Sequence, residues 1–363
     1  MKKAFLLILA LGMACIGVNA QDQEFKFVPA TELTLVGKLF PDTPNPYHRV
    51  DTVRFKGFTP GENNQVRQCS GLAVAFRTDS PVIRLKATTG RMEHPSNTMS
   101  NAARGFDLYI RKGGKWLWAA AGGAMSEKKQ DNPYTIISNM DGSMHECLLY
   151  LPLMSELYTL DIGVAAEATI EAIPNPFRHR VAIFGSSFTH GVSCSRSGMT
   201  YPAQFSRSTG IQLLNLGCGG NCKLQDYFGR VLAAVDAEAF LFDAFSNPSR
   251  IQLRARLFPF IEQLQAAHPG KPLIFQRTIY REKRNFNTYE DEREADRLRI
   301  ADSLMNIACR RYKDVYYIKT TTATSKSHEA TVDGIHPDNY GYSLWAGSIE
   351  KPVLRILRKY GIR

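Results

Sequence analysis

The sequence lacks a long apolar stretch beyond its first 20 residues. No later run reaches the roughly 18 consecutive apolar residues that a membrane-spanning helix needs, so no membrane span is expected. The chain carries a net charge of +11, but its basic residues are spread out and form no stripe interleaved with aromatic residues. Nucleic acid is therefore not an expected partner. Internal repeats and low-complexity tracts are absent as well, which excludes repeat architectures.

The one apolar segment at the N-terminus is typical of a targeting signal. Lys2 and Lys3 form a positive start, an apolar stretch follows, and the segment ends in the small residue Ala20. This pattern predicts a signal peptide over residues 1–20 that is cleaved near Ala20, and hence a secreted or periplasmic protein. Cys15 follows Gly12 where a lipoprotein signal needs a bulky aliphatic residue three positions earlier, so lipoprotein anchoring is not expected.

Cysteine is scarce, with seven residues in the whole chain. An oxidising compartment permits disulfides, and Cys194, Cys218 and Cys222 lie in loops that we expect to converge, so one disulfide among them is a possibility that the sequence leaves open. A zinc site is less favoured. The spacing from Cys218 to Cys222 is tolerable, but no second close pair of Cys or His completes a ligand set.

The first half of the chain has the pattern of a β-sandwich. Short runs rich in β-forming residues are separated by turn signals such as the Gly-Gly pair at 113–114 and the Asp-Gly pair at 141–142. The expected strands cover residues 33–36, 71–76, 82–87, 106–110, 146–151 and 157–162. Many short strands without helical periodicity predict a β-sandwich domain over residues 25–175. Pro174–Pro176 is a plausible linker after it.

The second half, residues 178–363, alternates between apolar runs and helical stretches. The expected strands cover residues 181–184, 211–216, 239–242, 272–275 and 315–318. Helices are expected over residues 201–208, 224–235, 251–267, 290–312 and 342–359. This alternation predicts an α/β domain with a parallel sheet covered on both faces, in which ligands bind beyond the carboxyl ends of the strands.

Two motifs in this half carry chemistry. Residues 184–191 read FGSSFTHG and place Ser187 in a turn just after a strand. Residues 333–337 read DGIHP and place Asp333 three residues before His336. A serine nucleophile needs an adjacent base, and a histidine base needs an orienting acceptor, so Ser187, His336 and Asp333 are the predicted catalytic residues. Each motif alone is weak, because a Gly-Ser-Ser segment is most often an ordinary turn.

Residues 180–359 resemble the SGNH (GDSL-type) hydrolase family. The FGSS segment resembles its first block, residues 215–221 (NLGCGGN) the second, residues 245–247 (FSN) the third and the DGIHP segment the fifth. The resemblance implies a flavodoxin-like three-layer α/β/α fold and an oxyanion hole formed by Ser187, Gly220 and Asn247. It implies neither a metal nor a cofactor. Residues 105–109 (GFDLY) resemble the GxDLY signature of a β-domain that precedes some of these hydrolases.

The chain departs from the family pattern at two positions. Ser186 stands where the first block usually has aspartate, although a subset of the family carries Gly-Ser-Ser, and Pro248 stands where the third block usually continues with aspartate. A Gly-x-Ser-x-Gly elbow is absent, which argues against an α/β-hydrolase.

The function expected from these features is that of an exported serine esterase that removes small acyl groups, acetyl above all, from carbohydrates. Two alternatives remain open at this point: a lipid or thioester hydrolase, and a glycan-binding protein without catalytic activity. The sequence leaves open the acyl group, the sugar and the oligomeric state, because a fold does not determine its substrate.

Overall fold

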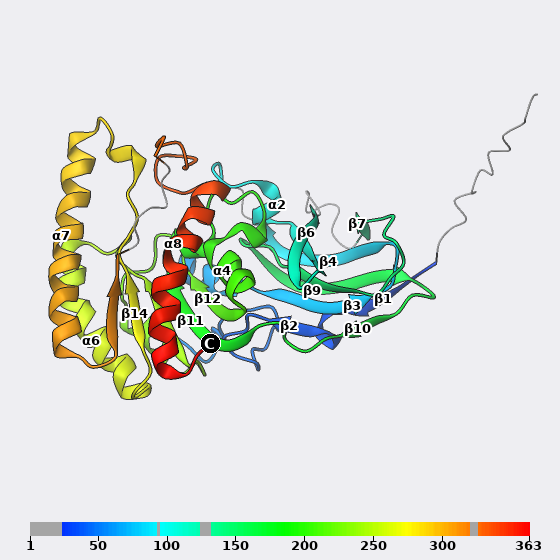
Figure 1. Cartoon of the computed structure of the whole chain (residues 1–363), viewed down its shortest axis with the longest axis horizontal. Coiled ribbons are helices and arrows are strands. Elements are labelled where there is room, and N and C mark those ends of the chain that lie inside the picture. Colours follow the sequence, from blue (N-terminus) through cyan, green and yellow to red (C-terminus); the bar gives the residue numbers. More distant parts are fainter. Residues whose placement is uncertain (1–23, 93–94, 124–131, 320–325) are drawn as a thin grey trace, which may run out of the picture.

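The computed structural model describes residues 24–92, 95–123, 132–319 and 326–363. An antiparallel β-rich half and a parallel α/β half lie side by side, as Figure 1 shows. The predicted signal peptide, residues 1–20, lies outside the described residues. None of the helices in the described part of the chain is long and apolar enough to span a membrane.

The N-terminal half is a sandwich of two antiparallel sheets, as predicted. One sheet has the order β1-β9-β4-β7, and the other has the order β10-β3-β8-β5-β6, with β2 also paired to β3. The strands are β1 (Phe25–Pro29), β2 (Thr34–Val36), β3 (Ala73–Thr78), β4 (Ile83–Met92), β5 (Phe106–Lys112), β6 (Lys115–Gly122), β7 (Tyr134–Ile137), β8 (His145–Tyr150), β9 (Ser155–Ala165) and β10 (Ile170–Ala172). Inward-facing residues such as Phe76, Leu85, Leu149 and Ile162 form one buried cluster between the sheets.

The sequence pattern missed a helical segment within this half. Helix α1 (Pro60–Arg67) begins with a capping box, in which the Thr59 side chain accepts from the Glu62 backbone and the Glu62 side chain accepts from the Thr59 backbone. The segment around α1 leaves the sandwich and packs on the other half. Leu39, Phe40 and Val66 share a buried cluster with Phe184 of the parallel sheet. A short helix α2 (Ser100–Ala103) precedes β5.

The C-terminal half has the three-layer flavodoxin-like fold that the family resemblance implied. Its parallel sheet has the order β12-β11-β13-β14-β15, which is the 2-1-3-4-5 order of that fold. The strands are β11 (Arg178–Gly185), β12 (Ile211–Gly217), β13 (Ala239–Asp243), β14 (Leu273–Gln276) and β15 (Val315–Ile318). The helices are α3 (Ser187–His190), α4 (Tyr201–Thr209), α5 (Asp226–Ala233), α6 (Arg250–Ala267), α7 (Thr288–Arg311) and α8 (Asn339–Leu357).

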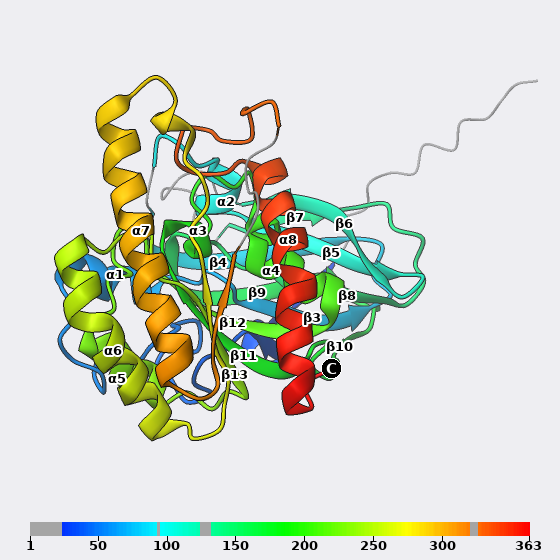
Figure 2. The same ribbon diagram turned by 60° about the vertical axis from the view of Figure 1, so that its left-hand side comes forward.

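Helices cover both faces of this sheet. In Figure 2, α5, α6 and α7 lie on one side of the strands, and α4 and α8 lie on the other. Alternate residues of β11 explain this arrangement. Ala182 and Phe184 join the buried cluster under α5 to α7, whereas Val181 and Ile183 join the cluster under α4 and α8. The strand is therefore apolar on both faces, as a central parallel strand must be.

The GFDLY segment lies on β5 and connects the two halves. The buried carboxylate of Asp107 accepts from Nη1 of Arg196 at 3.0 Å and from the backbone N–H of Gly198 at 2.8 Å. The same Arg196 nitrogen donates to the hydroxyl of Tyr109 at 2.6 Å. The aspartate and tyrosine of this motif thus hold the loop that follows α3 in the parallel half.

The structure corrects the possibility of a disulfide near the predicted serine. Cys194, Cys218 and Cys222 are all buried free thiols. Cys194 belongs to the apolar cluster on the α4 and α8 side of the sheet, whereas Cys218 and Cys222 belong to the cluster on the opposite face. The sheet therefore separates Cys194 from the other two thiols. Burial raises the pKa of the Cys218 thiol to about 12, which keeps it protonated.

Candidate active site

The turn after β11 presents Ser187 at the edge of the sheet. Gly185 ends the strand, and a Cβ at this position would lie 1.9 Å from Oγ1 of Thr189, so no larger residue fits without rearrangement. The side chain of Ser186 caps α3 by accepting from the backbone N–H of Phe188 at 3.2 Å. Ser187 is the first residue of α3, where a backbone N–H has no partner within the helix.

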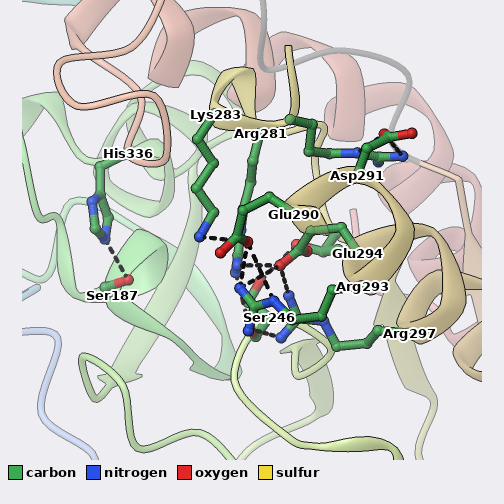
Figure 3. Close-up of polar contacts among 12 residues, drawn as sticks. Ser187, Ser246, Arg281, Lys283, Glu290, Asp291, Arg293, Glu294, Arg297 and His336 are labelled. Atoms are coloured by element: carbon green, nitrogen blue, oxygen red, sulfur yellow. Dashed lines mark hydrogen bonds and ion pairs between the residues drawn. The ribbon is translucent and has the colours of Figure 1, made fainter. Parts of the chain in front are cut away.

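The three predicted catalytic side chains are in contact. Nε2 of His336 lies 2.9 Å from Oγ of Ser187 (Figure 3), and Nδ1 of His336 lies 2.8 Å from Oδ2 of Asp333. Since the carboxylate can only accept, Nδ1 carries the proton and Nε2 is free to accept the proton of Ser187. Oδ1 of Asp333 also accepts from the backbone N–H of His336 at 2.8 Å, which fixes the DGIH loop.

The electrostatics of this group suit a neutral base beside an ionised acid. Burial opposes the charge on Asp333, but the backbone and ring N–H groups of His336 and the amide of Asn97 outweigh it and lower the pKa of Asp333 to about 2. Burial also lowers the pKa of His336, and the positive charges of Arg281 and Lys283 add to this, although Asp333 raises it. His336 is therefore mainly neutral at pH 7.

The absent aspartate of the first block has a structural counterpart that sequence reasoning missed. Asp243 ends β13, and in the parallel register it lies opposite Gly185 of β11. Its Oδ2 accepts from Oγ of Ser186 at 2.7 Å, from the backbone N–H of Ser186 at 3.1 Å and from Oγ1 of Thr189 at 3.0 Å. Burial raises the pKa of Asp243 to about 6 against these bonds. An acidic residue at the end of the buried FLFD strand was the available signal.

Gly220 and Asn247, the two further residues predicted for the oxyanion hole, line the same cleft as Ser187. Gly220 has a φ of +71°, a conformation that favours glycine. Oδ1 of Asn247 accepts from the backbone N–H of Cys222 at 3.2 Å. This bond assigns the oxygen to the Cys222 side, so the amide nitrogen of Asn247 points away from Cys222. A Cβ on the neighbouring Gly219 would lie 3.6 Å from Cβ of Ser187, so this loop borders the serine directly.

The loop that carries Asn247 is held firmly despite Pro248. The carbonyl oxygen of Ser246 accepts from Nη2 of Arg281 at 2.9 Å and from Nη1 of Arg297 at 2.8 Å. The hydroxyl of Ser246 lies 2.6 Å from that of Thr278. These contacts come from outside the motif, and they fix the backbone next to Asn247.

Among the polar side chains of the N-terminal half that contact the site region are those of Asn97, Gln65 and Arg49. Nδ2 of Asn97 donates to Oδ2 of Asp333 at 2.8 Å. Nε2 of Gln65, on α1, donates to the carbonyl oxygen of Gly219 at 3.0 Å. The fully buried Arg49 donates through Nη1 to the carbonyls of Asn215 at 3.2 Å and Gly217 at 2.9 Å. None of these three belongs to a recognisable motif, so nothing in the sequence pointed to them.

The cleft has a volume of about 790 Å³ and lies between the two halves. Its polar side chains come from α1 and the β4–α2 loop on one side, and from Ser187, Asn247, His336 and three arginines on the other. Among the described residues, no group of three or more His, Cys, Asp or Glu side chains is arranged to hold a metal ion. The cleft contains a serine that is hydrogen-bonded to a histidine, with N–H donors around the pair.

Two family models match the chain. Residues 178–355 match the GDSL-like lipase/acylhydrolase family, and residues 25–170 match the GxDLY model, the N-terminus of SGNH-hydrolase-type esterases. No curated protein matches the sequence at a significant level.

Solved structures show the same two-part architecture. A GDSL-like lipase from Bacteroides ovatus is 36% identical over 92% of this chain and 98% of that chain, with a TM-score of 0.87. The salicylyl-acyltransferase SsfX3 is 18% identical over 93% and 99%, with a TM-score of 0.69. A family two carbohydrate esterase from Cellvibrio japonicus is 9% identical over 92% and 98%, with a TM-score of 0.60. The last two share the fold alone. The chain belongs to the GDSL-like lipase/acylhydrolase family and is a hydrolase of ester bonds.

Proposed function

We propose that this chain is an exported serine esterase that removes small acyl groups, acetyl above all, from carbohydrates, with Ser187, His336 and Asp333 as its catalytic residues. The observation that carries the proposal is the continuous set of hydrogen bonds from Ser187 through His336 to Asp333, at 2.9 and 2.8 Å, at the edge of a polar cleft.

The reaction follows from the positions of these groups. Oγ of Ser187 attacks the ester carbonyl carbon while Nε2 of His336 takes its proton, and Asp333 stabilises the imidazolium that forms. The tetrahedral oxygen accepts from the backbone N–H groups of Ser187 and Gly220 and from the amide of Asn247. His336 then protonates the leaving alcohol oxygen, and the acyl group stays on Ser187. A water that His336 deprotonates releases the acid and restores the serine.

The lining of the cleft favours a polar substrate over a lipid. The carboxamide side chains of Asn64, Gln65, Gln68 and Asn97 are among the residues that line the cleft, and groups of this kind bind hydroxyls well. A long acyl chain needs a mainly apolar wall instead. The fold is shared with carbohydrate esterases, one of which was solved with cellohexaose, and this agrees with a carbohydrate substrate. Export rests on the sequence pattern of residues 1–20 alone.

Purified protein incubated with p-nitrophenyl esters of increasing acyl length and with acetylated oligosaccharides tests the proposal. We expect the highest kcat/KM at acetyl, and a loss of at least about 10⁴-fold in the Ser187→Ala variant. Ser208→Ala, on α4 outside the cleft, is the matched control and should keep wild-type rates. A maximum at long acyl chains would indicate a lipid hydrolase. Activity no higher than that of Ser187→Ala on every ester would indicate a binding protein.

A further inference from the structure

A cluster of cations lies to one side of the Ser187 and His336 pair. Figure 3 shows Arg281 and Lys283, which follow β14, gathered with Arg293 and Arg297 of α7. The proposed reaction uses none of these four side chains directly.

The carboxylates in the cluster do not balance its positive charge. Glu294 is 2% exposed and accepts from Arg281 at 3.0 Å, from Arg293 at 3.4 Å and also from Arg297. Glu290 pairs with Lys283 at 3.0 Å and with Arg293 at 2.6 Å. Four cations share these two carboxylates, and the buried Asp243 also acts on Arg281 through its charge. Three carboxylates against four cations leave an excess of positive charge beside the nucleophile.

This excess faces the substrate cleft. Arg281, Arg293 and Arg297 all line it, whereas none of the described residues that line it is Asp or Glu. Because low-dielectric walls focus the field of charges of one sign, we expect a positive potential in the cleft.

Arg293 is the member of the cluster most open to a ligand. Its side chain is 45% exposed, compared with 8% for Arg281 and 10% for Arg297. Nε and Nη2 of Arg293 bind Glu290, at 3.2 and 2.6 Å, and no contact within the described part of the chain occupies Nη1. A guanidinium with free N–H groups suits a carboxylate, because the planar donors match the two oxygens.

The two inner arginines, Arg281 and Arg297, are incompletely hydrogen-bonded. Nε of Arg281 and Nε of Arg297 are buried and have no hydrogen-bond partner in the described residues. Burying cations that are incompletely paired costs free energy. An anion held beside them would offset part of this cost.

We propose that Arg293, supported by Arg281, Arg297 and Lys283, forms a carboxylate-binding subsite, so that the preferred substrates are esters with a carboxylate close to the reacting bond. An acylated acidic sugar such as a uronate fits this chemistry and the carboxamides on the opposite side of the cleft. A carboxylate on the acyl group has the same chemistry. The proposal rests on the esterase function proposed above and specifies its substrate class.

Two pairs of substrates distinguish these sources of the carboxylate. O-acetylated oligogalacturonate is compared with O-acetylated xylo-oligosaccharide of equal length, and p-nitrophenyl hemisuccinate with p-nitrophenyl acetate. We expect a higher kcat/KM for the charged member of at least one pair. In Arg293→Gln the ratio of charged to neutral kcat/KM should fall about tenfold, mainly through KM. Added salt should reduce the ratio in the wild type.

Arg299→Gln is the matched control, because Arg299 lies on the same helix and outside the cleft lining. It should leave the ratio unchanged. Equal kcat/KM within both pairs, or a ratio that Arg293→Gln does not alter, would overturn the subsite while the esterase function stands. Calorimetry of oligogalacturonate with Ser187→Ala protein, with and without Arg293→Gln, gives a readout that does not depend on catalysis. Weaker binding in the double variant supports the subsite even if no ester is hydrolysed, and equal binding in both proteins overturns it.

Discussion

The two halves of the molecule contribute to the cleft in different ways. The parallel-sheet half provides every side chain to which we assign a chemical step, and these side chains lie in the loops after its strands. The β-sandwich half and the segment around α1 provide neutral amides and the buried Arg49, which bind the backbone or the carboxylate of those loops. One half therefore carries the proposed reactive groups, and the other half contacts and supports them, so the sandwich is part of the candidate site.

The GxDLY signature likewise has a positioning role. Asp107 and Tyr109 hold Arg196 in the loop beyond α3, at 3.0 and 2.6 Å. The motif marks an interface between the halves and contributes nothing to the cleft lining.

Removal of the Arg49 side chain should weaken the contact between the two halves and destabilise the folded protein. Its guanidinium donates to four backbone carbonyls, those of Gln65, Gln68, Asn215 and Gly217, and no water can replace these bonds in the interior. We expect Arg49→Met to lower the free energy of unfolding by about 4 kcal/mol. Urea titration followed by circular dichroism measures this loss.

The matched control is Arg230→Met, because within the described residues Arg230 pairs with Asp226 alone, on the surface of α5. Its effect should stay within about 0.5 kcal/mol. Equal urea midpoints for Arg49→Met and Arg230→Met would show that Arg49 does not join the halves.

Loss of the Asn247 amide should affect catalysis and leave the fold intact. Asn247→Ala removes one donor to the tetrahedral oxygen, and we expect kcat to fall about 10²- to 10³-fold. Asn247→Asp sharpens the test, because it keeps the acceptor for the Cys222 N–H and lacks the amide donor. Steady-state kinetics on p-nitrophenyl acetate should show both variants impaired. A fully active Asn247→Asp would mean that residue 247 only anchors its loop.

Asn97 tests whether the sandwich half positions the acid. Its amide donates to Asp333 at 2.8 Å, and Asn97→Ala should reduce kcat about tenfold through poorer orientation of His336. Asn97→Asp should reduce it further, because a second carboxylate beside Asp333 is repulsive. An unchanged kcat with a raised KM in Asn97→Ala would assign Asn97 to substrate binding instead.

The kcat/KM should increase as the pH rises. His336 acts as a base in its neutral form, and burial places its pKa below the ordinary value of 6.5. The kcat/KM should therefore rise with pH, with a midpoint below 6.5, and level off by about pH 7. A midpoint above 6.5 would show that Asp333 outweighs burial and the nearby cations.

The strand ends explain why the sequence could bring together the residues of the candidate site. Ser187, Gly220 and Asn247 each follow an apolar run, and a parallel sheet brings such positions to one edge. Asn97 and Arg49 could not be found in this way, because their roles depend on contacts between segments over 100 residues apart in the chain. Asp243 could have been predicted in the same way, since it ends the strand beside β11. The capping box of α1 was also readable and was missed.

Labelling with a fluorophosphonate, followed by peptide mass spectrometry, shows whether Ser187 is the nucleophile. The probe reacts only with a serine that a neighbouring base activates. We predict one adduct, on Ser187, and its loss in His336→Ala. An adduct on a different serine, or ester hydrolysis by a protein whose Ser187 stays unlabelled, would contradict the assignment of Ser187 as the nucleophile.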